Sequence, residues 1–114
     1  MKLVDYSSQM GKKLFVVDIN DVMFQVALED ISHIVRKDNE TIIVSNDWQK
    51  IFTSKPLLEF EEQLKQFGFD QINDETIINK QNIYRYGNNS VNNTIMMKNM
   101  EIFKVANSHF DVTK

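Results

Sequence analysis

The sequence contains no cysteine, one proline and three glycines in 114 residues. Without cysteine the chain cannot form a disulfide framework, a thiolate nucleophile or a cysteine-ligated zinc or iron–sulfur site. The scarcity of glycine and proline, together with a hydrophobic fraction of 42%, argues against a fibrous or disordered chain. A chain of this length fits a single core, so we expect one soluble globular domain.

Long apolar runs are also missing. No uninterrupted stretch approaches the roughly 18 residues that cross a bilayer, and the beginning of the sequence lacks the apolar centre of a signal peptide. We therefore expect a cytoplasmic protein without a membrane partner. Residues 1–13 are polar and weakly patterned, which is typical of a tail or the remnant of a linker, and we assign residues 14–114 to the single domain.

Positive charge is not in excess. The 13 lysines and arginines stand against 16 aspartates and glutamates, and the formal net charge is -3. Domains that bind nucleic acid usually carry a basic patch, because neutralising phosphates releases counterions. The net charge therefore counts against DNA binding, although a local group of cations can bind phosphate on a molecule that is acidic elsewhere.

The common catalytic motifs are absent from the sequence. It has no glycine-rich phosphate loop, no Gly-x-Ser-x-Gly turn and no pair of histidines at metal-binding spacing. His33 and His109 lie in different expected elements. We expect His33 to be structural or at the surface. The sequence therefore predicts no enzyme, no metal and no cofactor.

What the sequence has instead is a series of short runs rich in valine, isoleucine and phenylalanine. Asparagine and aspartate, which favour tight turns, separate several of them, at residues 20–21, 38–39 and 46–47. The pattern predicts a mainly β domain of several short antiparallel strands and sheets. The expected strands are residues 14–17, 22–27, 31–36, 41–45, 48–53, 70–72, 76–78, 82–86, 93–97 and 101–105.

One segment has the period of a helix. Apolar side chains recur at spacings of three and four, so they share one helical face: Leu57, Phe60, Leu64 and Phe67. We predict an amphipathic helix over about residues 55–67, with Ser54 as its N-cap and Pro56 in its first turn. Gly68 suits the left-handed backbone that ends many helices.

The segment from residue 69 to 83 resembles the signature of LytTR-type DNA-binding domains. The apolar and asparagine skeleton of that signature is present as Phe69, Ile72, Ile77, Ile78, Asn79, Asn82 and Ile83. Residues 28–31 look like the opening strand motif of the family, 57–64 like its helix and 104–110 like its closing motif. Together these motifs cover the chain from about Phe15 onward. Their order and spacing resemble those of the family, and the resemblance implies the LytTR fold.

The resemblance implies sequence-specific binding to promoter DNA, with loops of a β fold entering successive major grooves. It also implies two copies on direct-repeat half-sites, with a possible dimer on the DNA, and a receiver or sensor domain in a longer parent chain. Carried onto this sequence, the reading segments are residues 36–40, 71–75 and 107–109. The candidate DNA contacts are Arg36, Lys37, Asn39, Gln71, Asn73, Asn107, Ser108 and His109.

Four of the candidate contacts have a plain structural alternative. Arg36 and Lys37 are donors for phosphate or guanine, because a guanidinium can hold guanine O6 and N7 in a fork, or they mark a solvated strand end. Asn73 stands where the family often has histidine, and its amide can pair with adenine or form a turn. Asn107 stands where the family usually has arginine, and it too has the turn-forming alternative.

Acidic residues in the second reading segment support a rival function. Asp74 and Glu75 would repel phosphate, so the same fold could serve as a protein-binding or antagonist module that has lost DNA binding. In that case the segment 96–103 would supply a partner surface, although its methionines look first like core packing. A positive strip is the expected mark of DNA binding, and it would join Arg36, Lys37, Lys80 and Lys104.

Overall fold

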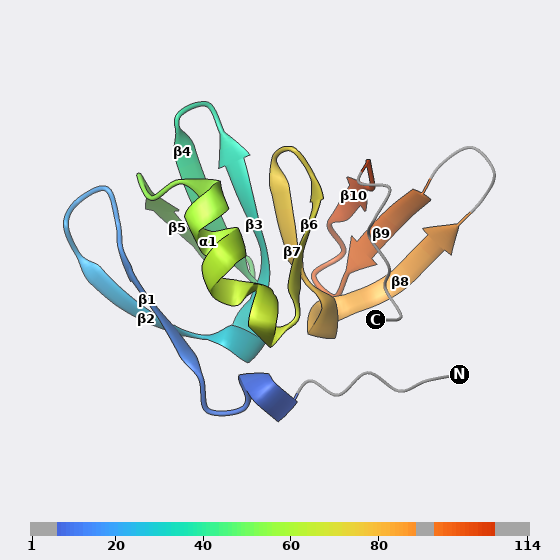
Figure 1. Cartoon of the computed structure of the whole chain (residues 1–114), viewed down its shortest axis with the longest axis horizontal. Helices are drawn as coiled ribbons and strands as arrows, with labels where there is room; N and C mark the ends of the chain where they lie inside the picture. Colours follow the sequence, from blue (N-terminus) through green and yellow to red (C-terminus); the bar gives the residue numbers. More distant parts are fainter. Residues whose placement is uncertain (1–6, 89–92, 107–114) are drawn as a thin grey trace.

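The computed structural model describes residues 7–88 and 93–106, and this part of the chain forms three antiparallel sheets and one α-helix (Figure 1). The strands and the helix are β1 (Lys13–Val17), β2 (Met23–Ala27), β3 (Ile31–Lys37), β4 (Glu40–Ser45), β5 (Lys50–Thr53), α1 (Leu57–Leu64), β6 (Phe69–Asn73), β7 (Thr76–Asn79), β8 (Ile83–Asn88), β9 (Asn93–Met97) and β10 (Ile102–Lys104). Four short 3-10 helices join them: η1 (Ser7–Gln9), η2 (Leu28–Asp30), η3 (Lys65–Phe67) and η4 (Lys80–Asn82).

The sheets are a pair β1-β2, a central sheet in the order β5-β4-β3-β7-β6 and a third sheet in the order β10-β9-β8. All strand pairings among the described residues are antiparallel, which confirms the predicted mainly β fold. The tight turns form where aspartate was expected to favour them. Asp21 and Asp38 have φ values of 64° and 57°, a left-handed conformation that aspartate tolerates better than most residues.

The helix is shorter than the sequence predicted, and Ser54 does not cap it. Its N-cap is Pro56, whose backbone is extended at φ -61° and ψ 147°, and no side chain caps the first turn. Proline also disfavours the helical region for the residue before it, so Lys55 is held outside the helix. At the other end, Gly68 leaves η3 with φ 89°, the left-handed exit that was predicted.

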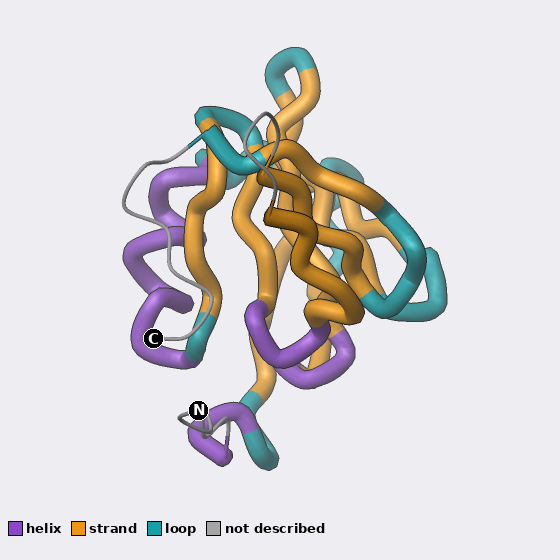
Figure 2. The backbone as a smooth tube through the Cα atoms, turned by 90° about the vertical axis from the view of Figure 1, so that its right-hand side faces the viewer, coloured by secondary structure: helices purple, strands orange, loops and turns teal. Residues whose placement is uncertain are grey.

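The helix covers one face of the central sheet, as the 90° view shows (Figure 2). The main core joins this face to the β1–β2 pair, and its buried members are Leu14, Val16, Leu28, Ile31, Ile34, Ile43, Leu57, Phe60, Leu64, Phe69 and Ile77. A second cluster joins the central sheet to the third sheet through Ile72, Ile78, Ile95 and Met97. Because Ile77 and Ile78 are consecutive and point to opposite faces, β7 serves both cores.

The signature asparagines hold the scaffold together from inside. Asn79 is fully buried, and its Nδ2 donates to the carbonyls of Leu28 at 3.0 Å and Ile31 at 2.9 Å. The Nδ2 of Asn82 donates to the carbonyls of Glu29 at 2.9 Å and Ile31 at 2.7 Å. These bonds fix the link between β2 and β3 against β7 and η4, so both asparagines satisfy backbone groups that the fold buries.

Part of the expected N-terminal tail is built into the domain. Gln9 is fully buried, and its Nε2 donates to the carbonyl of Phe67 at 2.6 Å and to Oδ1 of Asn79 at 2.8 Å. Strand β1 begins at Lys13. The side chain of Gln9, together with the carbonyl of Lys12, which accepts from the N–H of Leu28 at 3.0 Å, therefore ties this segment to the domain. The assignment of residues 1–6 to a tail lies outside the described residues.

His33 sits inside the molecule, between two sheets. It is 3% exposed, its ring lies edge-on to Phe103 with centroids 4.6 Å apart, and its Nδ1 is 2.9 Å from the hydroxyl oxygen of Ser32. Burial lowers the pKa of His33 from 6.5 to about 4, and the charge of Lys50 acts in the same direction. The structural alternative that the sequence left open for His33 is therefore the one observed.

The lowered pKa of His33 makes stability depend on pH. Above pH 6.5 the ring is neutral in both the folded and the unfolded chain; between pH 6.5 and 4 only the unfolded chain takes up the proton, so acidification favours unfolding. We expect this interval to remove about 2–3 kcal/mol of unfolding free energy. Urea titrations of wild type and His33→Gln at several pH values will test it. An equally steep loss in the variant would contradict the assignment.

In the described part of the chain, no helix is both long and apolar enough to cross a membrane.

Candidate nucleic-acid interface

Two hairpin turns lie side by side at one end of the strands of the central sheet. Strand β3 ends at Lys37, and the following turn leads into β4; β6 ends at Asn73, and its turn leads into β7. The backbone N–H of Arg36 donates to the carbonyl of Glu75 at 2.8 Å, which holds the turns side by side. Both lie at the top of the molecule in Figure 1. We call residues 36–39, 73–75 and Lys104 the turn edge.

Strand β10 belongs to the turn edge because Asn73 connects it to the second turn. The Nδ2 of Asn73 donates to the carbonyl of Lys104 at 3.0 Å, and the N–H of Ala106 donates to the carbonyl of Ile72 at 2.8 Å. The chain that leads to the third expected reading segment thus runs beside β6. Asn107, Ser108 and His109 themselves lie outside the described residues, and their contacts with DNA stay a prediction.

The side-chain amide of Asn73 is engaged within the turn. Its Oδ1 accepts from the N–H of Glu75 at 2.9 Å, while its Nδ2 holds Lys104. Gln71 lies just below, half-buried, and its Nε2 donates to the backbone carbonyl of Asn73 at 3.0 Å. A base contact by the Asn73 amide would have to replace both bonds. The geometry therefore gives Asn73 the turn-forming role that the sequence had left as an alternative.

The turn edge carries charges of both signs. Arg36 and Lys37 are exposed, and among the described residues neither side chain has a carboxylate within 4.0 Å. Asp38, Asp74 and Glu75 are exposed on the same two turns. The electrostatic potential of the turn edge is therefore not uniformly positive. Its attraction for a polyanion depends on the difference between the nearby cations and the nearby carboxylates.

The predicted positive strip of four side chains is wrong in one member. Lys80 lies in η4, which follows the end of β7 far from the turns (Figure 1), and its Nζ is 3.9 Å from a carboxylate oxygen of Asp70. Lys104, in contrast, is exposed and tied to the second turn through Asn73. The tertiary structure thus gathers three of the expected cations and removes the fourth.

The start of α1 is a third part of this region, which the sequence motifs did not indicate. An open depression of about 790 Å³ lies between the turns and the segment that precedes α1, and Ser54, Pro56 and Leu58 line it together with Arg36 and Glu75. Leu58 is 62% exposed. Its position off the apolar face of the helix was the available signal, because an apolar residue on the polar face has no core to fill. Asn39, one of the candidate contacts, is exposed in the first turn.

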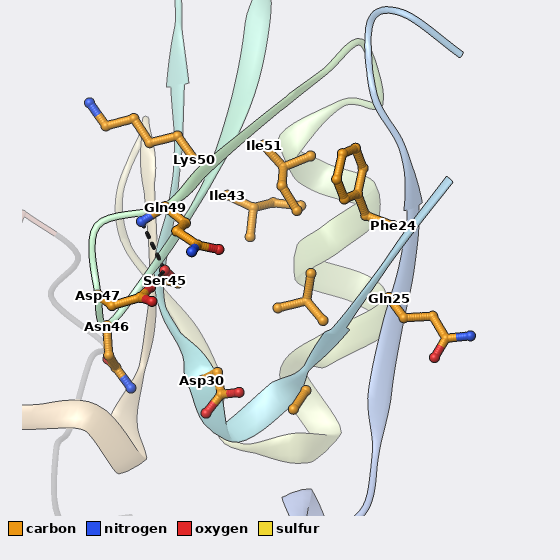
Figure 3. Close-up of a pocket in the computed structure, with 12 residues that line it drawn as sticks. Phe24, Gln25, Asp30, Ile43, Ser45, Asn46, Asp47, Gln49, Lys50 and Ile51 are labelled. Atoms are coloured by element: carbon orange, nitrogen blue, oxygen red, sulfur yellow. Dashed lines mark hydrogen bonds between the residues drawn. The ribbon is translucent and has the colours of Figure 1, made fainter. Parts of the chain in front are cut away.

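A second hollow lies away from the turn edge, between β2 and the strands β4 and β5. It measures about 480 Å³, and Phe24, Ile43 and Ile51 line it from opposite sides, with α1 behind them (Figure 3). Its polar rim includes Ser45, whose hydroxyl accepts from the N–H of Gln49 at 3.0 Å. Within residues 7–88 and 93–106, no three histidine, aspartate or glutamate side chains gather in a way that could hold a metal ion.

Comparisons with known proteins agree with this fold. The model of the LytTr DNA-binding domain matches residues 21–112. One solved structure with a similar fold is described as the LytTr DNA-binding domain of a methyl-accepting/DNA response regulator from Bacillus cereus; the TM-score is 0.70 at 21% identity, over 83% of this chain and 87% of that chain. The comparison with curated proteins finds no match. Because the family model covers most of the sequence, this chain belongs to the LytTR family of DNA-binding domains.

Proposed function

We propose that this domain reads promoter DNA through the turn edge, with the two adjacent turns inserted into the major groove. The observation that carries the proposal is the hydrogen bond from the backbone N–H of Arg36 to the carbonyl of Glu75. This bond holds the two turns together, so that their exposed cations project from the same end of the molecule. A guanidinium at that position can hold guanine in a fork, and the lysines can contact phosphate. Asn39 is exposed beside them and can donate to or accept from a base edge.

The wider setting follows from the family. We propose two copies on direct-repeat half-sites about one helical turn, roughly 34 Å, apart, and a receiver or sensor domain in a longer parent chain, at work in the cytoplasm. Anisotropy titration of promoter fragments at low and moderate salt tests the central claim. Specific binding should exceed binding to scrambled DNA and weaken as salt rises. Equal binding to both sequences, or none at low salt, would refute it.

The carboxylates of the second turn should limit affinity. Asp74 and Glu75 are exposed beside Arg36 and near the expected path of the phosphates. We expect Asp74→Asn with Glu75→Gln to strengthen DNA binding by about 2–10-fold at low salt, because two repulsive charges are removed. Glu61→Gln with Glu62→Gln, on α1, changes the net charge by the same amount and serves as the matched control. A gain of the same size in the control would show a general charge effect.

Asn73 should act by positioning the turn. Asn73→Ala removes the bonds to Glu75 and Lys104, so we expect DNA affinity to fall by a similar factor, about 3–10-fold, for specific and scrambled DNA alike. A direct adenine contact would instead relax discrimination at particular base pairs by about 1–3 kcal/mol. Titration against a set of single-base variants of the site separates the two results.

The mixed charge of the turn edge also keeps the protein-binding module as a second candidate. Asp38, Asp74 and Glu75 would suit a partner with basic groups better than a phosphate backbone. The segment 96–103, expected to supply the partner surface, is divided. Met97 is fully buried and Phe103 packs against the second core, whereas Met100 and Ile102 are 60% and 57% exposed. Failure to bind any promoter fragment at low salt would favour this candidate over DNA reading.

A further inference from the structure

The outer face of the β1–β2 hairpin is apolar and exposed. Along β1 the side chains alternate, so that Leu14 and Val16 are buried in the main core while Phe15 and Val17 point outward, 55% and 43% exposed. An ordinary surface strand places polar residues on its outer face. This strand has apolar residues on both faces, and its inner face alone accounts for the packing of the domain.

The exposed apolar residues lie toward the tip of the hairpin, while the exposed Gln25 is a polar residue on the same face, directly opposite Phe15. Met23 lies directly opposite Val17 in the strand register and is 60% exposed, and the tip of the hairpin adds Ile19 and Val22 at 54% and 48%. Directly opposed side chains on one face of an antiparallel pair have Cβ atoms about 4.5–5.5 Å apart. We call Phe15, Val17, Ile19, Val22 and Met23 the hairpin patch. Contiguous exposed apolar surface of this kind marks a site of association.

The hairpin patch takes no part in the proposed DNA binding. The hairpin projects from the side of the molecule opposite the third sheet, and the turn edge lies at the top (Figure 1). Asp18 and Asp21 stand at its tip, where they would repel phosphate. The Oδ1 of Asp18 also accepts from the N–H groups of Asn20 and Val22 at 2.8 and 2.9 Å, so this carboxylate is a fixed part of the turn.

We propose that the hairpin patch binds the same patch on a second copy of this chain, in a two-fold symmetric pair. The charges at the two ends of the hairpin are complementary: Lys12 and Lys13 lie where β1 begins, and Asp18 and Asp21 lie at the tip. When two hairpins pack face to face in opposite directions, the lysines of each copy meet the aspartates of the other. Such self-complementarity is what an isologous interface requires.

The size of the patch fits a weak pair. Fully covered aromatic side chains bury about 150–250 Å² each, so five large apolar residues that are about half exposed supply at most about 400–600 Å² per copy, less than the roughly 800 Å² per copy of a standard interface. We expect dissociation in the micromolar range. In a two-fold symmetric pair the two domains point in opposite directions, whereas direct-repeat half-sites require two domains in the same orientation. The pair is therefore a form of the protein without DNA, and the two copies separate when they bind the proposed sites.

Sedimentation velocity of the full chain without DNA, from about 1 μM to about 1 mM, tests the pairing. Wild type should shift from monomer to dimer, and Phe15→Thr and Met23→Thr should each raise the dissociation constant at least about 10-fold, one step of roughly 1.4 kcal/mol. Threonine keeps the strand preference at these exposed positions, and circular dichroism confirms folding. Ile102→Thr, at a strand position 57% exposed outside the patch, is the matched control and should leave the dimer unchanged.

A charge reversal tests the arrangement of the pair. Lys13→Glu should weaken the dimer about 3–10-fold at low salt, with the difference shrinking at high salt, because an attraction to an aspartate becomes a repulsion. A monomer at every concentration overturns the proposal. A dimer that persists in both Phe15→Thr and Met23→Thr overturns the assigned surface. Neither result would contradict the proposed DNA binding, since a monomer with an intact turn edge would still bind promoter fragments.

Discussion

Asn79→Ala is expected to lower the free energy of unfolding by about 3–5 kcal/mol. The side chain is fully buried, its Nδ2 donates to the carbonyls of Leu28 and Ile31, and its Oδ1 accepts from Gln9 and from the N–H of Gln81. Alanine would leave these buried groups without partners, and each unsatisfied group costs about 1–3 kcal/mol. Urea unfolding followed by circular dichroism measures the change.

A matched substitution separates burial from residue type. Asn39 is exposed in the turn between β3 and β4, so Asn39→Ala should change the free energy of unfolding by no more than about 0.5 kcal/mol. If Asn79→Ala costs as little as this control, water replaces the amide, and the scaffold does not depend on the asparagine. We also expect Asn79→Ala to weaken DNA binding only as far as it unfolds the protein, because the turn edge lies at the other end of β7.

Arg36→Ala combined with Lys37→Ala is expected to weaken DNA binding by about 10–100-fold at moderate salt. Both side chains are exposed on the turn edge, and none of the described carboxylates lies within 4.0 Å of either. Each phosphate contact contributes about 0.9 to the slope of log affinity against log salt, so the slope should fall by up to about 2. Loss of phosphate contacts should weaken specific and scrambled DNA together, and any further loss on the specific site measures base reading by Arg36.

The control for this prediction removes the same charge elsewhere. Lys65 in η3 and Lys98 after β9 are exposed and lie outside the turn edge. Lys65→Ala with Lys98→Ala should therefore leave both the affinity and its salt dependence nearly unchanged. An unaltered titration for the Arg36 and Lys37 pair, or equal losses in the two pairs, would mean that the DNA lies against a different part of the domain.

Local patterns predicted the elements of the fold well where neighbouring residues decide the structure. Alternation along residues 13–17 buries Leu14 and Val16, aspartate takes the left-handed position of the turn at Asp38, and Gly68 ends the helical segment. The start of the helix was misjudged for an equally local reason. Ser54 is a good capping residue, but Pro56 disfavours a helical backbone at the residue before it, so the N-cap falls at Pro56 and the helix begins only at Leu57.

Residue types alone did not give the contacts that join distant parts of the chain. Gln9 looked like a member of a polar tail, yet it is buried against Asn79 and Phe67. Asn73 offered an amide suited to adenine, yet that amide closes its own turn and holds Lys104. In each case the side chain can make several kinds of hydrogen bond, and its partner is set by which backbone groups the fold brings near it.

The candidate interface shows the same division. The resemblance to the family pointed to the segments around Arg36 and Asn73, and the structure brings these segments together through one backbone hydrogen bond. It adds the exposed Leu58 from the start of the helix and excludes Lys80, which lies at the far end of β7 beside Asp70. A sequence cannot rank cations by their distance from one another, because strand order and register determine that distance.

By itself the sequence determined that this protein is a small, mainly β domain with one amphipathic helix, free of cysteine chemistry, since periodicity and turn preferences act between residues close in the chain. The tertiary structure alone decided that Arg36, Lys37 and Lys104 share an edge with Asp74 and Glu75, and that the hairpin patch stays uncovered. Those outcomes depend on sheet order and on how the sheets pack, which are long-range contacts that no local pattern encodes.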